Sequence, residues 1–347
     1  MAYTTINKST DYFNTLLYTG TGSALNVTGV GFDPDWIWTK CRSDADQHEL
    51  YDKVRGATKR IRTNSTDAEN TESYQSFISD GFAWSGTGNQ NTNGRTYASW
   101  NWKANGAGSS NTDGTITSTV SANTTAGFSV GTYTANATAG ATVGHGLGVA
   151  PDMLIIKARN NSNNWAVYHK KVGATKAIYL DSTSGETTDG WMNNTAPSSS
   201  VFTLSGGNYG NASGYTVVFY AFAEKKGYSK FGSYTGNGNA NGTFIYTGFK
   251  PSFVMTKRTD STSNWYMMTG KASDYSSGDD GVNPLDRPLF ANLTSAENNG
   301  DNRVDFLSNG FKFYDSGAAQ NGSGATNIYM AFGQSLVGSN NVPCTAR

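Results

Sequence analysis

Apolar residues along this chain of 347 residues follow the period of β-strands rather than that of helices. In residues 98–102, 218–222 and 328–332 the large apolar side chains stand at every second position, so they share one face of an extended strand. Residues 36–40 and 153–156 are apolar on both faces, which is typical of a strand in the middle of a packed sheet. Clusters of Gly, Asn, Ser and Thr interrupt these segments about every 8 to 12 residues, and this spacing predicts all-β sandwich or barrel modules.

One phrase of ten residues occurs three times, at residues 31–40, 148–157 and 248–257. In each copy a proline stands six residues before a lysine, with a largely apolar strand between them. The prolines are 117 and then 100 residues apart (Pro34, Pro151 and Pro251). Solenoids and propellers repeat every ~20 to 50 residues, whereas a period of about 100 is the size of an independent domain. The sequence therefore predicts three related modules.

Further positions recur in register with this phrase. Fourteen residues after each proline stand His48, Trp165 and Trp265, and three residues later Tyr51, Tyr168 and Met268. Polar turns then carry Asn64, Asp181 and Asn292, each five residues before a glutamate (Glu69, Glu186 and Glu297). Because the glutamates recur once per module, we expect a shared structural role, such as holding a loop amide, rather than catalysis. Asp80-Gly81 and Asn309-Gly310 stand between apolar residues and predict hairpins.

The predicted fold is three tandem, mutually related β-sandwich modules of jelly-roll-like type. Module boundaries are expected near 108–127 and 225–230, where the sequence is rich in Gly, Ser, Thr or Lys, which gives modules 1–110, 111–226 and 227–347. Aromatic residues are abundant, with 8 Trp, 19 Tyr and 17 Phe. Large rings bury much area per residue, so a module of about 110 residues can still build a core.

Charge limits the classes of partner. Lys and Arg number 26 and so do Asp and Glu, with no basic stripe, so nucleic acid is not expected as a partner. A small basic cluster does occur at Arg55, Lys59, Arg60 and Arg62. Since Asp44, Asp46, Glu49 and Asp52 immediately precede it, solvated ion pairing is its expected role.

Compartment signals are absent from the sequence. The N-terminus Met1-Ala-Tyr-Thr-Thr has neither the basic region nor the apolar run of a signal peptide, and no apolar stretch is long enough to span a membrane. We therefore expect synthesis in a cytoplasm and no membrane insertion. The two cysteines, Cys41 and Cys344, are too few for a disulfide framework and lack the spacing of a zinc site.

Motifs of catalysis are not found. His48, His145 and His169 lack metal-ligand spacing, and His48 stands where the other copies have tryptophan, so packing is its expected role. Asp279-Asp280-Gly281 and the acidic run 44–52 could hold calcium, but neither has the spacing of an EF-hand loop. We predict no catalytic residue, no metal and no cofactor.

Aromatic residues in loop context are the remaining candidates for a site. Trp165 with Tyr168, and Trp265 with Tyr266, each follow an asparagine. A flat ring beside amide side chains can stack on a sugar while the amides bind its hydroxyls. The alternative is that these tryptophans cap the core of a sandwich, which their recurrence in the repeat favours.

Longer stretches of the sequence resemble a family of uncharacterised repeat proteins encoded by tailed bacteriophages, many of them marine, and by prophages. The stretches that carry the resemblance are 113–128, 142–153, 164–169, 191–197 and 227–238, with related motifs at 51–56, 64–66, 80–82 and 100–103. The resemblance covers nearly the whole chain and implies a structural protein of the virion, assembled in the host cytoplasm. It carries over no catalytic residue.

Three functions remain open at this point. The first is a tail-associated or fibre component that contacts other virion proteins and a host surface glycan or protein, as a homo-oligomer such as a trimer. The second is a decoration protein on the capsid surface. The third is a polysaccharide-degrading enzyme, which the scattered acidic residues disfavour, since glycoside hydrolysis needs two carboxylates about 5 to 9.5 Å apart.

Overall fold

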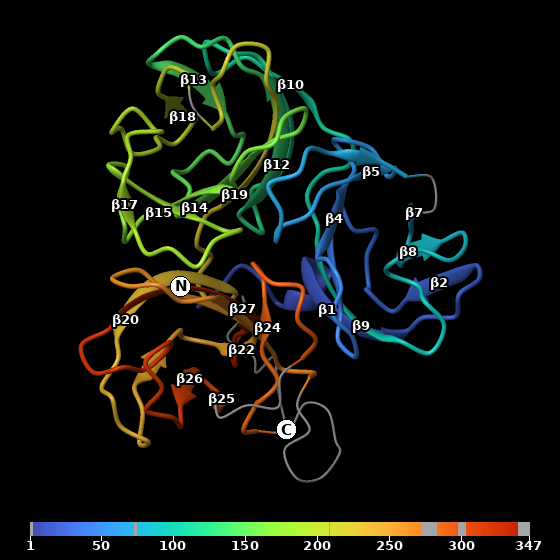
Figure 1. Ribbon diagram of the computed structural model, residues 1–347, viewed down its shortest axis with the longest axis vertical. Coiled ribbons are helices and arrows are strands. Elements are labelled where there is room, and N and C mark those ends of the chain that lie inside the picture. The colour runs from blue at the N-terminus through green and yellow to red at the C-terminus, as the bar shows by residue number, and fades with distance from the viewer. Residues whose placement is uncertain (1–2, 73–74, 208, 273–282, 298–302, 339–347) are drawn as a thin grey trace.

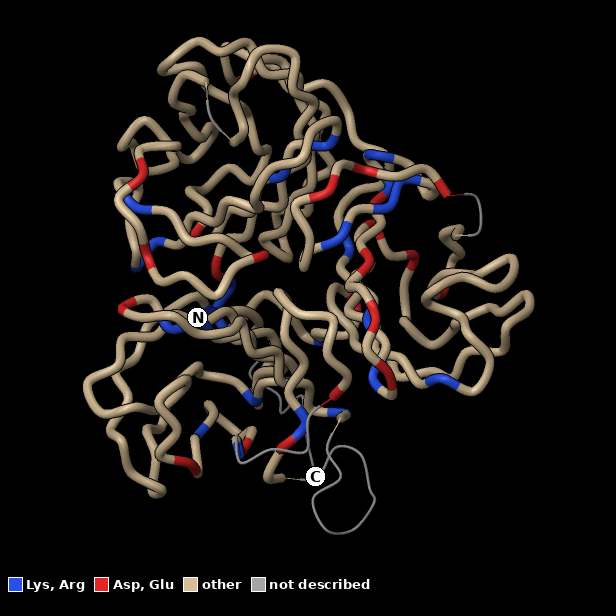
Figure 2. Tube along the Cα trace, viewed as in Figure 1, with Lys and Arg blue, Asp and Glu red and all other residues tan. Residues whose placement is uncertain are grey.

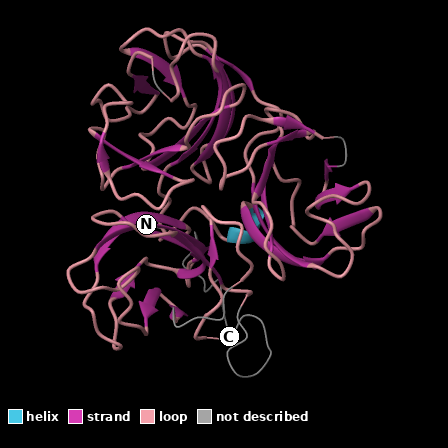
Figure 3. Cartoon of the chain, in the orientation of Figure 1, coloured by secondary structure: helices cyan, strands magenta, loops and turns pink. Residues whose placement is uncertain are grey.

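The computed structural model describes residues 3–72, 75–207, 209–272, 283–297 and 303–338. As predicted, the protein is all-β and its sheets are antiparallel (Figure 3). Within the described residues the one helical element is a 3-10 turn, η1 (Ser9–Asp11). None of the helical segments in this part of the chain is long and apolar enough to cross a membrane.

The strands fall into three consecutive groups, which surround a common centre (Figure 1). The first group has a sheet in the order β1-β9-β3-β4, a smaller sheet β2-β8-β7 and the short pair β5-β6. Their bounds are β1 (Phe13–Thr19), β2 (Leu25–Thr28), β3 (Trp36–Cys41), β4 (Glu49–Asp52), β5 (Lys59–Arg60), β6 (Asn70–Thr71), β7 (Gln75–Ile78), β8 (Gly81–Trp84) and β9 (Thr96–Trp102).

The second group has a large sheet β10-β11-β12-β19-β14-β15-β16-β17 and a pair β13-β18. Its strands are β10 (Ser109–Asn111), β11 (Ser118–Asn123), β12 (Phe128–Thr134), β13 (Ala141–Gly144), β14 (Met153–Ala158), β15 (Ala166–His169), β16 (Lys176–Tyr179), β17 (Thr187–Thr188), β18 (Val201–Leu204) and β19 (Thr216–Phe222). The third group has sheets β20-β27-β22-β23-β24 and β21-β26-β25. Its strands are β20 (Ser229–Thr235), β21 (Phe244–Tyr246), β22 (Lys250–Arg258), β23 (Trp265–Thr269), β24 (Leu289–Phe290), β25 (Val304–Leu307), β26 (Gly310–Phe313) and β27 (Thr326–Gln334).

The repeated phrase forms a central strand in every group, as its two apolar faces predict. β3, β14 and β22 each lie between two neighbours in the large sheet, and residues 36–41 and 153–158 are buried throughout. The pairing register is also the same, because in each copy the second residue after the proline lies opposite the last alternating residue of the closing strand. The pairs are Trp36 with Trp102, Met153 with Phe222, and Phe253 with Phe332.

The predicted hairpins form, and in each the glycine lies just after the turn. The strands pair Ile78 with Gly81 and Leu307 with Gly310, so each glycine opens the returning strand and does not lie inside the turn. A Cβ atom on Gly81 would lie 2.0 Å from the carbonyl oxygen of Val27, on the neighbouring strand β2. The glycine is therefore required by the close approach of two strands.

Two kinds of core hold the protein together. Each group has its own core between its two sheets, built around Phe82 in the first group, Phe202 in the second and Phe311 in the third. A further core is shared by all three groups and lies between their large sheets. The alternating residues of the closing strands β9, β19 and β27 face this shared core.

Three aromatic rings meet at the centre of the shared core. Trp102, Phe222 and Phe332 are the equivalent residues of the three closing strands, and their ring centroids are 6.4, 5.8 and 6.1 Å apart. Their planes are inclined by 64 to 76°, an edge-to-face geometry that aromatic pairs favour. The nearly equal separations of these equivalent residues are those expected for three groups placed around an approximate threefold axis. We call this arrangement the three-group assembly.

The predicted domain boundaries stay a prediction. β10 extends across the expected boundary at 110/111 and pairs with β11. The shared core means that no group buries its large sheet without the other two. The jelly-roll-like strand order predicted for each module likewise remains a prediction.

Candidate functional site

The predicted tryptophans lie in the contacts between neighbouring groups, which we call seams. Three equivalent positions each form a hydrogen bond from a ring nitrogen to a backbone carbonyl of the neighbouring group. The pairs are Trp165 with Arg62 (2.8 Å), Trp265 with Tyr179 (2.9 Å) and His48 with Phe290 (2.8 Å). The three carbonyls also occupy equivalent positions, two residues before Asn64, Asp181 and Asn292. The same bond therefore closes all three seams.

Burial removes the support for a sugar-binding platform on these aromatic residues. Trp165 is 0% exposed and Trp265 is 1% exposed, while Tyr168 and Tyr266 are 5% and 8% exposed. Neither indole presents a face to solvent, because both pack in the shared core. The arrangement corresponds to the alternative in which the tryptophans belong to the core, and we assign these four residues no binding role.

His48 performs the task of the tryptophan that it replaces. Its Nδ1 accepts a hydrogen bond from the indole Nε1 of Trp38 at 2.8 Å, so the proton of a neutral ring resides on Nε2, which donates to Phe290. Burial, aided by the charge of Lys40, lowers the pKa of His48 well below its usual value. The packing role expected from the sequence therefore fits a neutral histidine.

Amide capping is performed by the residues that precede the glutamates, not by the glutamates. The side chains of Asn64, Asp181 and Asn292 accept hydrogen bonds from the backbone N–H groups of His48, Trp165 and Trp265, at 2.9, 3.0 and 2.9 Å. Each bond lies within one group. It fixes the start of the strand that carries the seam residue.

The recurrent glutamates also lie at the seams. Their backbone N–H groups donate across each seam to equivalent carbonyls, Glu69 to Arg159, Glu186 to Thr259 and Glu297 to Arg42, at 2.6, 2.7 and 2.8 Å. Two of the side chains form ion pairs with the same partner residues, Glu69 with Arg159 and Glu297 with Arg42. Glu186 instead pairs with Lys176 of its own group. A structural role is what this geometry supports.

The basic cluster of the first group forms ion pairs, but they are buried rather than solvated. Asp52 and Arg55 have fully buried side chains and pair with each other, and the hydroxyl of Tyr220, from the second group, donates to Asp52 at 2.8 Å. Arg60 pairs with Glu49, which is also buried. In Figure 2, acidic and basic segments lie close together in the part of the first group that contains β4 and β5. The cluster therefore joins the first group to the second.

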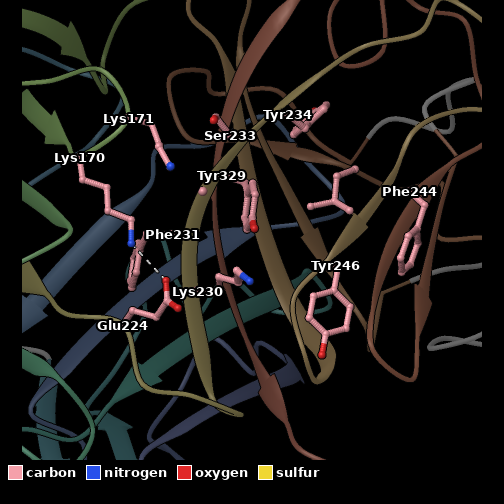
Figure 4. A pocket seen from close by; sticks show the side chains of 12 residues that line it. Lys170, Lys171, Glu224, Lys230, Phe231, Ser233, Tyr234, Phe244, Tyr246 and Tyr329 are labelled. Atoms are coloured by element: carbon pink, nitrogen blue, oxygen red, sulfur yellow. Dashed lines mark hydrogen bonds and ion pairs between the residues drawn. The ribbon is translucent and has the colours of Figure 1, made fainter.

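One groove on the outside of the protein combines aromatic rings with lysines (Figure 4). It lies between the second and third groups, encloses about 380 Å³, and is bordered by β20 and β21. Phe244 and Tyr246 of β21 are 44% and 55% exposed. Lys170, Lys171 and Lys230 also line it, with Glu224 as the one acidic residue.

The sequence prediction missed this groove. Residues 236–243 are rich in Gly and Asn, which directs attention to a turn instead of the short strand that follows. A usable signal does exist, because Phe244 and Tyr246 alternate with Ile245, while the equivalent residues of the second group, Thr142 and Gly144, are small. Two large rings on the outward side of a strand are unusual where a sibling copy has none.

The sequence predicts no metal site, although two acidic segments could form calcium loops. In the part of the chain that is described, no group of three or more His, Cys, Asp or Glu side chains is placed to hold a metal ion. Asp44 and Asp46 of the acidic run pair with Arg95 instead. Asp279-Asp280-Gly281 and Cys344 lie outside the described residues.

Comparison with known proteins places the chain in a family without assigning it an activity. No curated protein and no solved structure matches it. One family model, a domain of unknown function called DUF7483, matches residues 8–335. The matched region spans all three groups of strands. The chain belongs to the DUF7483 family.

Proposed function

We propose that this protein is a structural component of a phage virion, exposed on the particle surface as a tail-associated or host-attachment part. Two things support the proposal. One is the resemblance of long stretches of the sequence to virion proteins of tailed phages. The other is the three-group assembly, in which the recurrent polar residues join one group to the next.

The closed seams carry the structural part of the argument. Each group donates to and accepts from both neighbours, so the third group binds back to the first through Glu297 and Arg42. A fold that is closed in this way holds its outward loops in fixed positions around one axis. Such a body suits a particle component, whose task is to keep contact surfaces in place.

Multiple contacts with a host surface are part of the proposal, and the same geometry supports them. Three equivalent sets of outward loops surround one axis, as they would in a trimer, so several weak contacts can act together. Other virion proteins and a host surface glycan are the proposed partners. Because the copies differ most in their loops, host recognition is expected there.

Purified particles provide the test of this proposal. Mass spectrometry of particles purified on a density gradient should detect the protein at a fixed ratio to the major capsid protein, and its absence would refute virion membership. Labelling with antibody fragments and electron microscopy should place it at the tail. Labelling of the head would instead support a capsid decoration protein, and release of reducing sugar from host polysaccharide would support an enzyme.

A further inference from the structure

We propose that the free edge of β20 and the adjoining groove bind an extended, acidic segment of a partner polypeptide, which adds to the sheet antiparallel to β20. The argument compares three equivalent sheet edges within the chain. β1, β12 and β20 are equivalent strands, because the first residue of each pairs with the equivalent aromatic residue of its closing strand (Phe13 opposite Trp102, Phe128 opposite Phe222, Ser229 opposite Phe332).

The edge of β12 is covered by another strand. β11 pairs with it along its length, from Ser118 opposite Tyr133 to Asn123 opposite Phe128. The preceding residues continue over the second sheet, where Ile116 forms a parallel bridge with Val143. The segment 109–123 therefore occupies the space between β12 and β13.

The edge of β1 is blocked by a lysine side chain instead of a strand. Lys271 from the third group donates to the carbonyl oxygen of Thr15 at 2.6 Å and to the side chain of Asn14 at 3.4 Å. An ammonium group on the edge carbonyl blocks the pairing of a further strand, and lysines at edges are a common protection against such pairing.

Among the described residues, the middle of the β20 edge has neither protection, while at its end the carbonyl of Thr235 accepts a hydrogen bond from the hydroxyl of Thr243 at 3.1 Å. β20 is an edge strand of its sheet. The backbone N–H and C=O groups of its even-numbered residues point toward the neighbouring strand β27, since Gly236 donates to Ala325 and Gly333 donates to Tyr228. Alternation along an antiparallel strand turns the N–H and C=O of Phe231 and Ser233 outward. In the described part of the chain these outward groups form no hydrogen bond.

The chemistry of the groove indicates what would bind there. In the smaller sheet of the third group, Phe244 and Tyr246 stand where the second group has Thr142 and Gly144. The second group covers this place with its own segment 109–123, whereas in the third group the two rings are exposed and form an apolar floor. Lys171 has no carboxylate within ion-pair distance among the described residues, and Lys230 lies 5.3 Å from the ring of Tyr246. Positive charge beside a free edge favours a strand with carboxylates.

The register of β11 on β12 defines a concrete probe. Transferred to β20, it places Ala122 of β11 opposite Lys230, because Ala122 pairs with Ser129 and Ser129 is the equivalent of Lys230. The probe is the nine-residue peptide with the sequence of Ile116–Thr124, in its natural form and with Ala122→Glu. Residues directly opposite each other interact across strands, so the glutamate should bind about two- to fivefold more tightly.

The experiment measures amide hydrogen exchange of the full-length protein, by NMR, with each peptide at millimolar concentration. Binding by strand addition should slow exchange at the amides of Phe231 and Ser233 and leave Lys230 and Gly232 unchanged, since those two already bond to β27. The advantage of the Ala122→Glu peptide should disappear in a Lys230→Glu protein. Absence of protection at Phe231 and Ser233 would overturn the proposal, and the wild-type data decide this without any variant.

A matched pair of variants tests the edge itself. Ser233 is exposed and its N–H points outward, so Ser233→Pro removes the edge donor without removing a bond to β27, whereas Ser233→Ala keeps the donor. Peptide binding should be lost in the first variant and kept in the second, with circular dichroism confirming that both are folded. If an acidic oligosaccharide binds instead, with loss on Tyr246→Ala and none on Ser233→Pro, the groove is a sugar site and the proposal fails. The experiment uses isolated protein, so its outcome is independent of virion membership.

Discussion

The shared core makes a prediction about how the protein unfolds. Trp102 is 1% exposed, and it contacts Phe222 of the second group and Phe332 of the third. Trp102→Ala removes one corner of this contact, and replacing a buried tryptophan by alanine costs about 3 to 5 kcal/mol. Since the large sheets of all three groups face the same core, we expect the whole chain to unfold in one transition.

The size of the shift in melting temperature distinguishes one cooperative unit from three independent modules. Unfolding entropy is about 2.1 cal/mol/K per residue, hence about 0.7 kcal/mol/K for the full chain. A loss of about 3 to 5 kcal/mol then lowers Tm by about 4 to 7 °C. A single independent module of about 110 residues has a third of that entropy, so the same loss would lower its Tm by about 13 to 22 °C.

Differential scanning calorimetry is the appropriate assay. We expect one peak whose calorimetric and van't Hoff enthalpies agree, shifted as a whole in Trp102→Ala. Phe244→Ala is the control, because its side chain is 44% exposed and surface changes usually stay within about 0.5 kcal/mol. Several resolved transitions, with only one displaced by more than about 10 °C in Trp102→Ala, would refute the reasoning.

Three further predictions concern buried polar groups. Burial lowers the pKa of His169 to about 4, whereas histidine in the unfolded chain titrates at about 6.5. The free energy of unfolding should therefore fall as the pH drops from about 6.5 to about 4, by at most ~1.4 kcal/mol per pH unit for this residue. His169→Gln should flatten that slope in urea titrations. Burial also lowers the pKa of Lys157 to about 8, so the unfolded chain holds this proton more tightly and stability should rise from about pH 8 toward pH 10; an unchanged slope in Lys157→Met would contradict this. Asp52→Asn leaves the buried guanidinium of Arg55 without its nearest carboxylate and should lower the free energy of unfolding in urea by about 3 to 5 kcal/mol. The control Tyr220→Phe should cost about 1 kcal/mol. Equal losses would show that the ion pair adds nothing.

The sequence was sufficient for the fold class because the relevant patterns are local. A strand that is apolar on both faces must be covered on both sides, and this property alone places residues 36–41 in the middle of a sheet. The recurrence of one phrase then gives the number of groups. Both inferences need only neighbouring residues and their spacing.

What covers a buried face is not a local property, and here the sequence prediction was limited. Alternation in residues 98–102 indicates one buried face, yet it does not reveal that this face packs against two other groups. The same limit applies to Trp165, whose indole bonds to a carbonyl 103 residues away in the chain. Arg55 looked solvated for a related reason, since the residues that bury it include Tyr220 of another group.

The rings of Phe244 and Tyr246 leave a signal of the groove in the sequence, but the open edge of β20 beside them could not be predicted, because it depends on a difference between copies. β12 and β20 have similar sequence patterns, but only β12 is followed in space by a strand, β11, on its outer edge. Whether an edge is covered depends on the path of the connecting segment. Sequence periodicity carries no information about that path.

Joining the three groups in one chain has a consequence for how such a body can specialise. In a trimer of identical subunits, every substitution appears three times around the axis, so an edge that binds a partner would be open at three places and would invite self-association. Here the three edges differ. β12 pairs with β11, the carbonyl of Thr15 on β1 accepts a hydrogen bond from the ammonium of Lys271, and the outer edge of β20 pairs with no further strand among the described residues. Covalent linkage thus allows a nearly symmetric body to present one edge that differs from the other two, and a partner bound there would be held at one orientation around the axis.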